Sequence, residues 1–97
     1  MSGKAAPAGL GFRDAAPGDE ALVHRFVQGL AAYEKLPHLA VATEADFARA
    51  LFATPQRAWV MLVELDGQPV GMALYYFVFS TFTGRPGLYL EDIFLEP

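Results

Sequence analysis

Two adjacent carboxylates, Glu91 and Asp92, stand inside an otherwise apolar segment, and this pair constrains the fold more than any other feature. Residues 88–95 read as a β-strand, residues 68–79 read as the strand before it, and a turn-rich loop at 80–87 joins them. An ionised carboxylate is costly to bury without a partner. We therefore expect the rest of the chain to pack so that it presents this strand.

The two acids cannot serve the same purpose, because neighbouring residues of a strand point to opposite faces of the sheet. We expect Glu91 on the face of Ile93 and Asp92 on the face of Phe94. Glu91 is a candidate general base, because a carboxylate partly desolvated by aromatic neighbours holds a proton more tightly. The alternative is a structural carboxylate at the strand margin, paired with Arg85. For Asp92 the default is an exposed position.

The elements before the two strands complete a small α+β domain in residues 12–97, preceded by a disordered tail at 1–11. They are a short strand from Phe12, a helix that runs to about residue 34, a short helix after Thr43 and a strand at 58–65. The element order is β-α-α-β-β-β. Nothing in the sequence indicates a second domain or an internal repeat.

Composition excludes several classes of function. The 97 residues, 54% of them hydrophobic, suffice for one small domain. The net charge is −4 and the seven Lys and Arg residues are scattered, so neither nucleic acid nor a membrane is an expected partner. There is no cysteine, and His24 and His38 lie far apart, so we expect no metal site. Because no signal peptide or membrane-spanning run is found, we expect a soluble, cytoplasmic protein.

Several separated stretches form a pattern along nearly the whole chain from Phe12. They are RDA at 13–15, LAAYEK at 30–35, Thr43-Glu44 with Asp46, GMALYYF at 71–77, Thr83-Gly84 and LYLEDIFL at 88–95. In this order they resemble the GNAT superfamily of acetyltransferases, and most of all its diamine (spermidine/spermine) N-acetyltransferase-like branch. The resemblance implies an α/β (α+β) fold with a mainly antiparallel mixed sheet.

The resemblance also implies an activity, because the family transfers an acetyl group from acetyl-CoA to an amine that attacks the thioester directly. Glu91 matches the carboxylate that takes the ammonium proton, usually through water. The backbone of Ile93, Phe94 and Leu95 matches the strand that holds the acetyl and pantetheine arm. Substrate-side positions of the family fall on Tyr33, Glu34, Phe82 and Asp92. Phe82 stands where some relatives have Trp.

The family continues from this strand into a Gly-rich loop, R/Q-x-x-G-x-G/A, whose backbone amides bind the CoA pyrophosphate at a helix N-terminus. No such segment follows residues 88–95 in this sequence. We therefore expect the N-terminal half of a GNAT domain, truncated before the pyrophosphate loop and inactive alone. The alternative is a non-catalytic binding or dimerisation module derived from the substrate half of such a domain.

The last strand also predicts an assembly. We expect its outer edge to be unpaired and its apolar faces to be incompletely covered, exposing Leu90 and Phe94 or their neighbours on the opposite face. Flat apolar edges and patches recruit other chains. The sequence therefore predicts a homo-oligomer, most simply a two-fold dimer with residues 88–95 or the aromatic strand before them at the interface.

Overall fold

The computed structural model describes residues 9–97 and confirms the predicted element order, with one short turn of 3-10 helix added. The elements are β1 (Leu10–Asp14), α1 (Glu20–Tyr33), η1 (Pro37–Leu39), α2 (Glu44–Phe52), β2 (Trp59–Leu65), β3 (Gln68–Ser80) and β4 (Arg85–Leu95). Residues 1–8 of the predicted disordered tail lie outside the described residues. The tail boundary at residue 11 is wrong, because β1 already begins at Leu10 and pairs there with Leu65.

The four strands form one sheet in the order β1-β2-β3-β4, and every neighbouring pair is antiparallel. No parallel pair accompanies them among residues 9–97, so the mixed element of the expected sheet is not seen there. Short connections explain the pairings of β2 with β3 and of β3 with β4, since two-residue and four-residue turns can join only antiparallel neighbours. Asp66 and Gly67 both have positive φ, 52° and 79°, as a tight hairpin turn requires.

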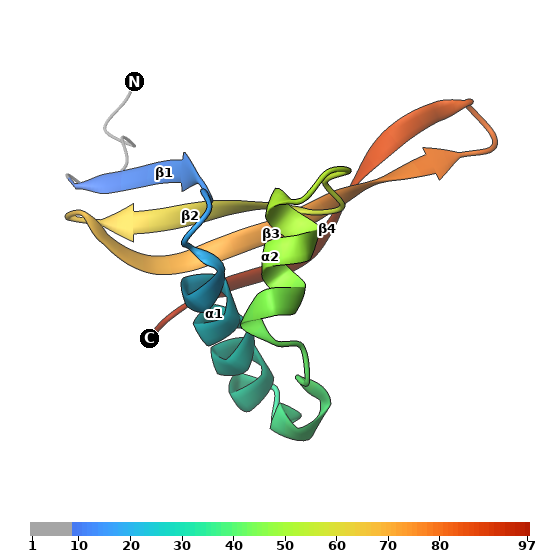
Figure 1. The fold of residues 1–97 in the computed structure, drawn as a ribbon. Helices are drawn as coiled ribbons and strands as arrows, with labels where there is room; N and C mark the ends of the chain where they lie inside the picture. The colour runs from blue at the N-terminus through green and yellow to red at the C-terminus, as the bar shows by residue number, and fades with distance from the viewer. Residues whose placement is uncertain (1–8) are drawn as a thin grey trace.

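The second hairpin is longer than predicted. β4 begins at Arg85, three residues before the expected start, and the predicted loop at 80–87 shrinks to a turn at 81–84. The backbone N–H of Gly84 donates to the carbonyl of Ser80 at 2.8 Å, and Gly84 has φ 68°. In Figure 1 this β3–β4 hairpin extends past the ends of β1 and β2 as a two-stranded ribbon.

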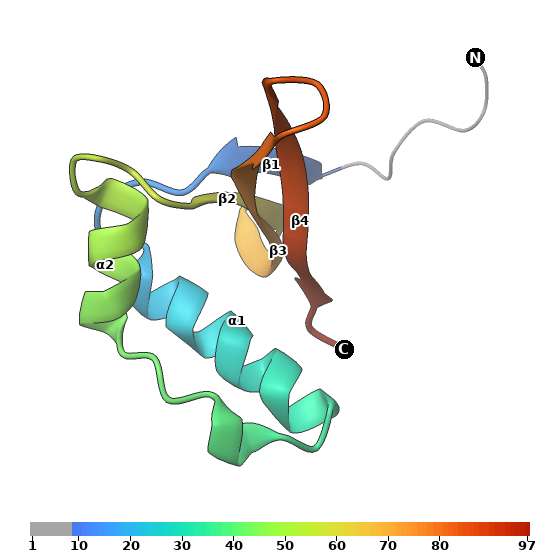
Figure 2. The same cartoon turned by 90° about the vertical axis from the view of Figure 1, so that its right-hand side faces the viewer.

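Both helices cover the same face of the sheet, and the core lies between them and β2, β3 and β4 (Figure 1, Figure 2). The amphipathic stripe predicted on α1 supplies Val23 and Phe26, which are fully buried. A capping box at Thr43 and Asp46 starts α2, as predicted. The core residues are Val23, Phe26, Leu51, Val60, Leu62, Met72 and Phe94.

Phe94 joins β4 to α1. Its ring lies 6.1 Å from that of Phe26, and a Cβ on Gly29 would stand 2.8 Å from Cζ of Phe94. Gly29 therefore admits this ring, which explains a glycine inside the helix. Phe94 is only 8% exposed, so the expectation that its face is uncovered is wrong, whereas Leu90 is 47% exposed.

No helix of the described residues covers the opposite face of the sheet (Figure 2). Side chains from all four strands line a shallow apolar hollow of about 330 Å³ there. Phe12, Ile93 and Leu95 are each about 60% exposed on this face (61%, 62% and 59%). The predicted exposure of opposite-face neighbours of Phe94 is thus confirmed.

Candidate active site

A β-bulge at Glu91 shapes the candidate site. Asp92 pairs with Leu74 of β3 and Leu90 pairs with Tyr75, so Glu91 has no residue opposite it. An extra residue in one strand inverts the alternation beyond it. Leu90 consequently faces away from the helices, whereas strict alternation along the strand predicts it on the face of Asp92 and Phe94. The bulge leaves Asp92 on the side of α1.

Asp92 lies in a hollow of about 250 Å³ between β4, the end of α1 and η1, and Glu34 lines the same hollow. Asp92 is half-buried, so the expected surface position is wrong. Desolvation raises the pKa of Asp92 above its usual value, and the negative charges of Glu91 and Glu34 raise it further. Two carboxylates in one apolar hollow favour a cation as its occupant.

The walls of this hollow come from a segment that the sequence did not single out. Leu36, Leu39 and Ala40 line it from the connection between α1 and α2. The side-chain amide of Gln28 donates to the carbonyl of Ala40 at 3.0 Å, which ties this connection to α1. Pro37 at the first position of η1 was the signal, because Pro suits the start of a helical turn.

Glu91 is exposed rather than desolvated by its aromatic neighbours. It forms none of the ion pairs found in residues 9–97, so the alternative pairing with Arg85 is not seen either. The rings of Tyr76 and Tyr89 stack beside it with centroids 5.1 Å apart. Desolvation raises the pKa of Tyr76, and the charges of Glu91 and Tyr89 raise it further. Glu91 thus lies exposed at the bulge, close enough to Tyr76 and Asp92 for its charge to raise the pKa of both.

Tyr33 lies on the other flank of α1. It lines a mainly apolar hollow of about 480 Å³ together with Phe94 and Leu95. Ile93 points to the opposite face of the sheet and lines the uncovered hollow there. The three residues predicted to bind the cofactor, Ile93 to Leu95, therefore lie together on β4, but their side chains do not line one common pocket.

Phe82 is not brought to this region by the structure. It lies in the turn between β3 and β4 and is fully exposed. Of the predicted substrate-side residues, Glu34 and Asp92 line a common hollow. Within residues 9–97 no group of His, Cys, Asp and Glu is placed to hold a metal ion. Neither α1 nor α2 could cross a membrane, because each is too short.

Sequence comparison finds acetyltransferases of small amines. The chain is 35% identical over 94 residues to thialysine N-epsilon-acetyltransferase of Sus scrofa, covering 89% of the chain and 55% of that protein. It is 32% identical over 91 residues to spermidine/spermine N(1)-acetyltransferase-like protein 1 of Homo sapiens, covering 87% of the chain and 13% of that protein. The chain spans about half the length of the thialysine acetyltransferases it matches. No family model matches the chain.

Solved acetyltransferases share the fold. An aminoglycoside acetyltransferase from an uncultured soil metagenomic sample, in complex with sisomicin, superposes with a TM-score of 0.70 at 15% identity. That match covers 91% of the chain and 57% of the solved protein. A predicted acetyltransferase from Clostridium acetobutylicum with acetyl-CoA gives a TM-score of 0.68 at 16% identity, covering 91% and 60%. The chain is thus similar in sequence to N-acetyltransferases over about nine-tenths of its own length, and it shares the fold of solved acetyltransferases.

Proposed function

We propose that residues 12–97 form the amine-binding half of an acetyl-CoA-dependent N-acetyltransferase whose acceptor is a small aliphatic amine. The observation that carries this proposal is the hollow between α1 and β4, in which Glu34 and the half-buried Asp92 face an otherwise apolar space. Neither carboxylate is in an ion pair within the described residues. A protonated alkylamine complements both features, since its charge meets the acids and its chain meets the apolar walls.

Acetyl-CoA, when bound, supplies the activated thioester, and the residues of this chain supply the rest. Glu91 takes a proton from the bound ammonium, directly or through water, so that the nitrogen lone pair is free to attack. In the transfer, the C–N bond would form as the C–S bond breaks, and the second proton of the amine nitrogen would pass to the departing thiolate of CoA. β4 is an edge strand of the described sheet. The outward-facing backbone groups of residues 93–95 can therefore form hydrogen bonds with the extended pantetheine arm of acetyl-CoA. The hollow of Tyr33, Phe94 and Leu95 lies beside that edge.

Turnover tests the proposal in a chimera that joins the 97 residues to the C-terminal part of the Sus scrofa relative. We expect acetyl transfer to small diamines, and we expect Glu91→Gln to lower turnover most at low pH, where removal of the proton is hardest. Asp92→Asn should raise KM for the amine instead. An unchanged pH–rate profile in Glu91→Gln would return Glu91 to a structural role.

Calorimetry tests cofactor binding by the 97-residue chain alone. We expect a dissociation constant for acetyl-CoA weaker than micromolar, and a micromolar constant corresponds to a binding free energy of about 8 kcal/mol.

A second candidate function is a binding or dimerising module, and the uncovered face of the sheet favours it. We propose that a second copy of the chain covers this face through a two-fold axis. The lining residues are all apolar: Leu10, Phe12, Met61, Val63, Met72, Ala73, Ile93 and Leu95. A two-fold axis would place each apolar face against its equal, and continuous apolar patches are rare on monomers. Sedimentation at micromolar concentration should show a dimer that Ile93→Glu dissociates, and a monomeric parent chain would refute this.

A further inference from the structure

The connection between α1 and α2, residues 36–42, forms one wall of the hollow that Glu34 and Asp92 also line. The residues of this wall are Leu36, Leu39 and Ala40. Residues 36–39 are all exposed, and none of residues 36–42 belongs to the buried core. Apolar packing therefore does little to hold the wall, and its position depends on hydrogen bonds.

Backbone hydrogen bonds fix the start of the connection. The N–H of Leu36 donates to the carbonyl of Ala31 at 2.8 Å, and the N–H of Lys35 donates to that of Ala32 at 3.0 Å. These two bonds, with Lys35 at φ 62°, form a Schellman motif that ends α1 and turns the chain back. In Figure 2 the connection then runs back alongside α1 toward α2. Leu36 is thus held beside Ala31, and both line the hollow.

One side chain ties the far end of the wall to α1. Nε2 of Gln28 donates to the carbonyl of Ala40 at 3.0 Å, and both residues are half-buried. The backbone N–H groups of residues 37–42 that donate hydrogen bonds in the described chain reach only carbonyls of residues 36–39. Gln28 is not among the residues that line the hollow. It therefore holds the wall without contacting what the hollow contains.

We propose that Gln28 is a positioning residue that sets the width of this hollow and thereby selects amines by shape. The inference rests on the amine-binding role proposed for the hollow. At about 250 Å³ the hollow is below the usual range of drug-sized ligand pockets, so it suits a slender amine. Without the bond from Gln28, the wall at Ala40 moves away from α1. A slender amine then loses apolar contact, and a wider amine gains room.

The test compares two ammonium ions of equal charge and equal carbon number, n-pentylammonium and cyclopentylammonium. NMR titration of the full 97-residue chain gives a dissociation constant for each. We expect the parent chain to prefer n-pentylammonium. Gln28→Met keeps a long side chain but removes the N–H donor. It should lower the preference about fivefold, in line with the loss of one neutral hydrogen bond.

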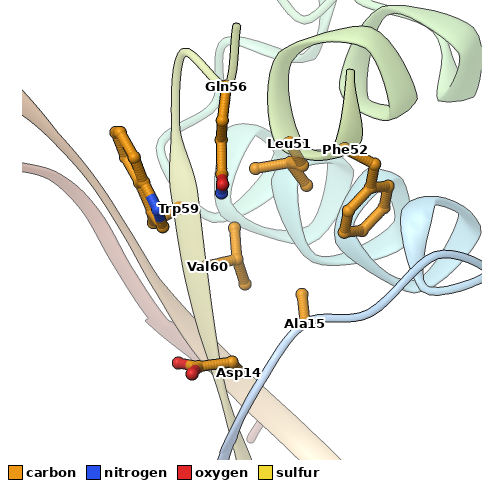
Figure 3. A pocket seen from close by; sticks show the side chains of 7 residues that line it. All are labelled: Asp14, Ala15, Leu51, Phe52, Gln56, Trp59 and Val60. Carbon is orange, nitrogen blue, oxygen red and sulfur yellow. The ribbon is translucent and has the colours of Figure 1, made fainter. Parts of the chain in front are cut away.

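Gln56→Met is the matched control. Nε2 of Gln56 also donates to a backbone carbonyl, that of Ala58, at 2.9 Å. Figure 3 shows Gln56 with Leu51 and Val60, which line a different hollow. The control variant loses the same kind of bond away from the wall, so its preference should equal that of the parent chain. An equal change in both variants would overturn the role of Gln28.

A second measurement follows the wall in the absence of an amine. Backbone relaxation in the free chain should give lower NMR order parameters for the amides of Leu39 and Ala40 in Gln28→Met than in the parent chain. Gln56→Met should leave these values unchanged. Order parameters that stay the same in Gln28→Met would show that the bond to Ala40 does not hold the wall, and would refute the proposal.

The outcomes separate this inference from the proposed function. A parent chain that binds neither ammonium ion would refute the amine-binding role and the selection by shape with it. A parent chain that prefers n-pentylammonium, together with a Gln28→Met variant that keeps the same preference, would overturn the role of Gln28 alone. In the chimera, Gln28→Met should raise KM for n-pentylamine about fivefold at unchanged kcat, because Gln28 does not line the hollow. A fall in kcat alone would contradict the proposal.

Discussion

Two pairs of acidic residues, one near β1 and one near β4, differ in whether a basic side chain lies beside them. At the β1 margin, Arg13 ties two elements to β1: its Nε lies 2.9 Å from Glu64 of β2, and its Nη1 lies 2.9 Å from Asp19 before α1. At the β4 margin, Glu34 and Asp92 share a hollow without a basic partner in the described residues. Arg13 thus holds Asp19 and Glu64, whereas Glu34 and Asp92 have no basic partner among the described residues.

The pKa directions follow the same division. Hydrogen bonding from Arg13 lowers the pKa of Asp19, and the backbone N–H of Ala16 lowers it further at 2.8 Å from Oδ2. Desolvation raises the pKa of Asp92, and the neighbouring acids add to it. The charged form of Asp19 stabilises the fold. The charged form of Asp92 costs stability, so we expect a reason other than folding for an acid at this position. The two directions separate Asp19, whose charged form the fold stabilises, from Asp92, whose charged form the fold disfavours.

The largest expected effect tests what holds β4 in place. Phe94→Ala removes a ring that contacts Phe26 and fills the space beside Gly29, so it should lower the free energy of unfolding by about 3 kcal/mol. Leu90→Ala is the matched control on the same strand, and its half-exposed side chain should cost less than about 1 kcal/mol. Urea unfolding followed by circular dichroism measures both. Equal losses would mean that α1 does not anchor β4 through Phe94.

A smaller effect is expected at the β1 margin. Asp19→Asn should lower the free energy of unfolding by about 1 kcal/mol at pH 7, because Arg13 stays solvent-accessible and screening limits the ion pair. The folded-state pKa of Asp19 lies below the unfolded value of 3.8, so this stabilisation is present above pH 3.8 and disappears as pH falls through the lower value. Urea unfolding at a series of pH values measures it. A difference that persists in strong acid would exclude this ion pair as its source.

The smallest effect should have the opposite sign. Asp92→Asn should raise the free energy of unfolding by a few tenths of a kcal/mol at pH 7, since it removes a charge that the fold desolvates. Because the folded-state pKa of Asp92 lies above the unfolded value of 3.8, the gain should appear as pH rises through the folded pKa and vanish below pH 3.8. Thermal unfolding against pH measures the effect. A loss of stability at pH 7 would show an unseen favourable partner for Asp92.

Most of the fold was predictable because local signals agree with the tertiary structure. The stripe of α1, the capping box at Thr43 and the Asp66-Gly67 turn each predicted an element that the structure contains. The long hairpin was less well predicted, because Pro86 and Gly87 read as loop residues. On an edge strand they are tolerated, since no strand of residues 9–97 pairs with the outer side of β4.

The site was predictable only in part. The sequence pointed to Glu91 and Asp92, yet simple alternation could not reveal the bulge that separates their environments. It assigned desolvation to Glu91, whereas Asp92 is the half-buried acid. The meeting of Glu34 with Asp92 joins the end of a helix to a strand more than 50 positions later, and no local pattern encodes such a contact. The roles of Glu91, Tyr33 and Phe82 stay predictions.

The central claim is that the partly desolvated carboxylate of Asp92 binds a cationic ligand. The direct measurement is the pKa of the Asp92 carboxyl group. It is followed through the chemical shift of the carboxyl carbon in an NMR titration of the 97-residue chain, without and with saturating n-butylammonium. The account predicts a pKa above 3.8 in the free chain that falls when the amine is present, because the cation stabilises the charged carboxylate. A pKa at or below 3.8 in the free chain, or one that the amine leaves unchanged, would contradict it.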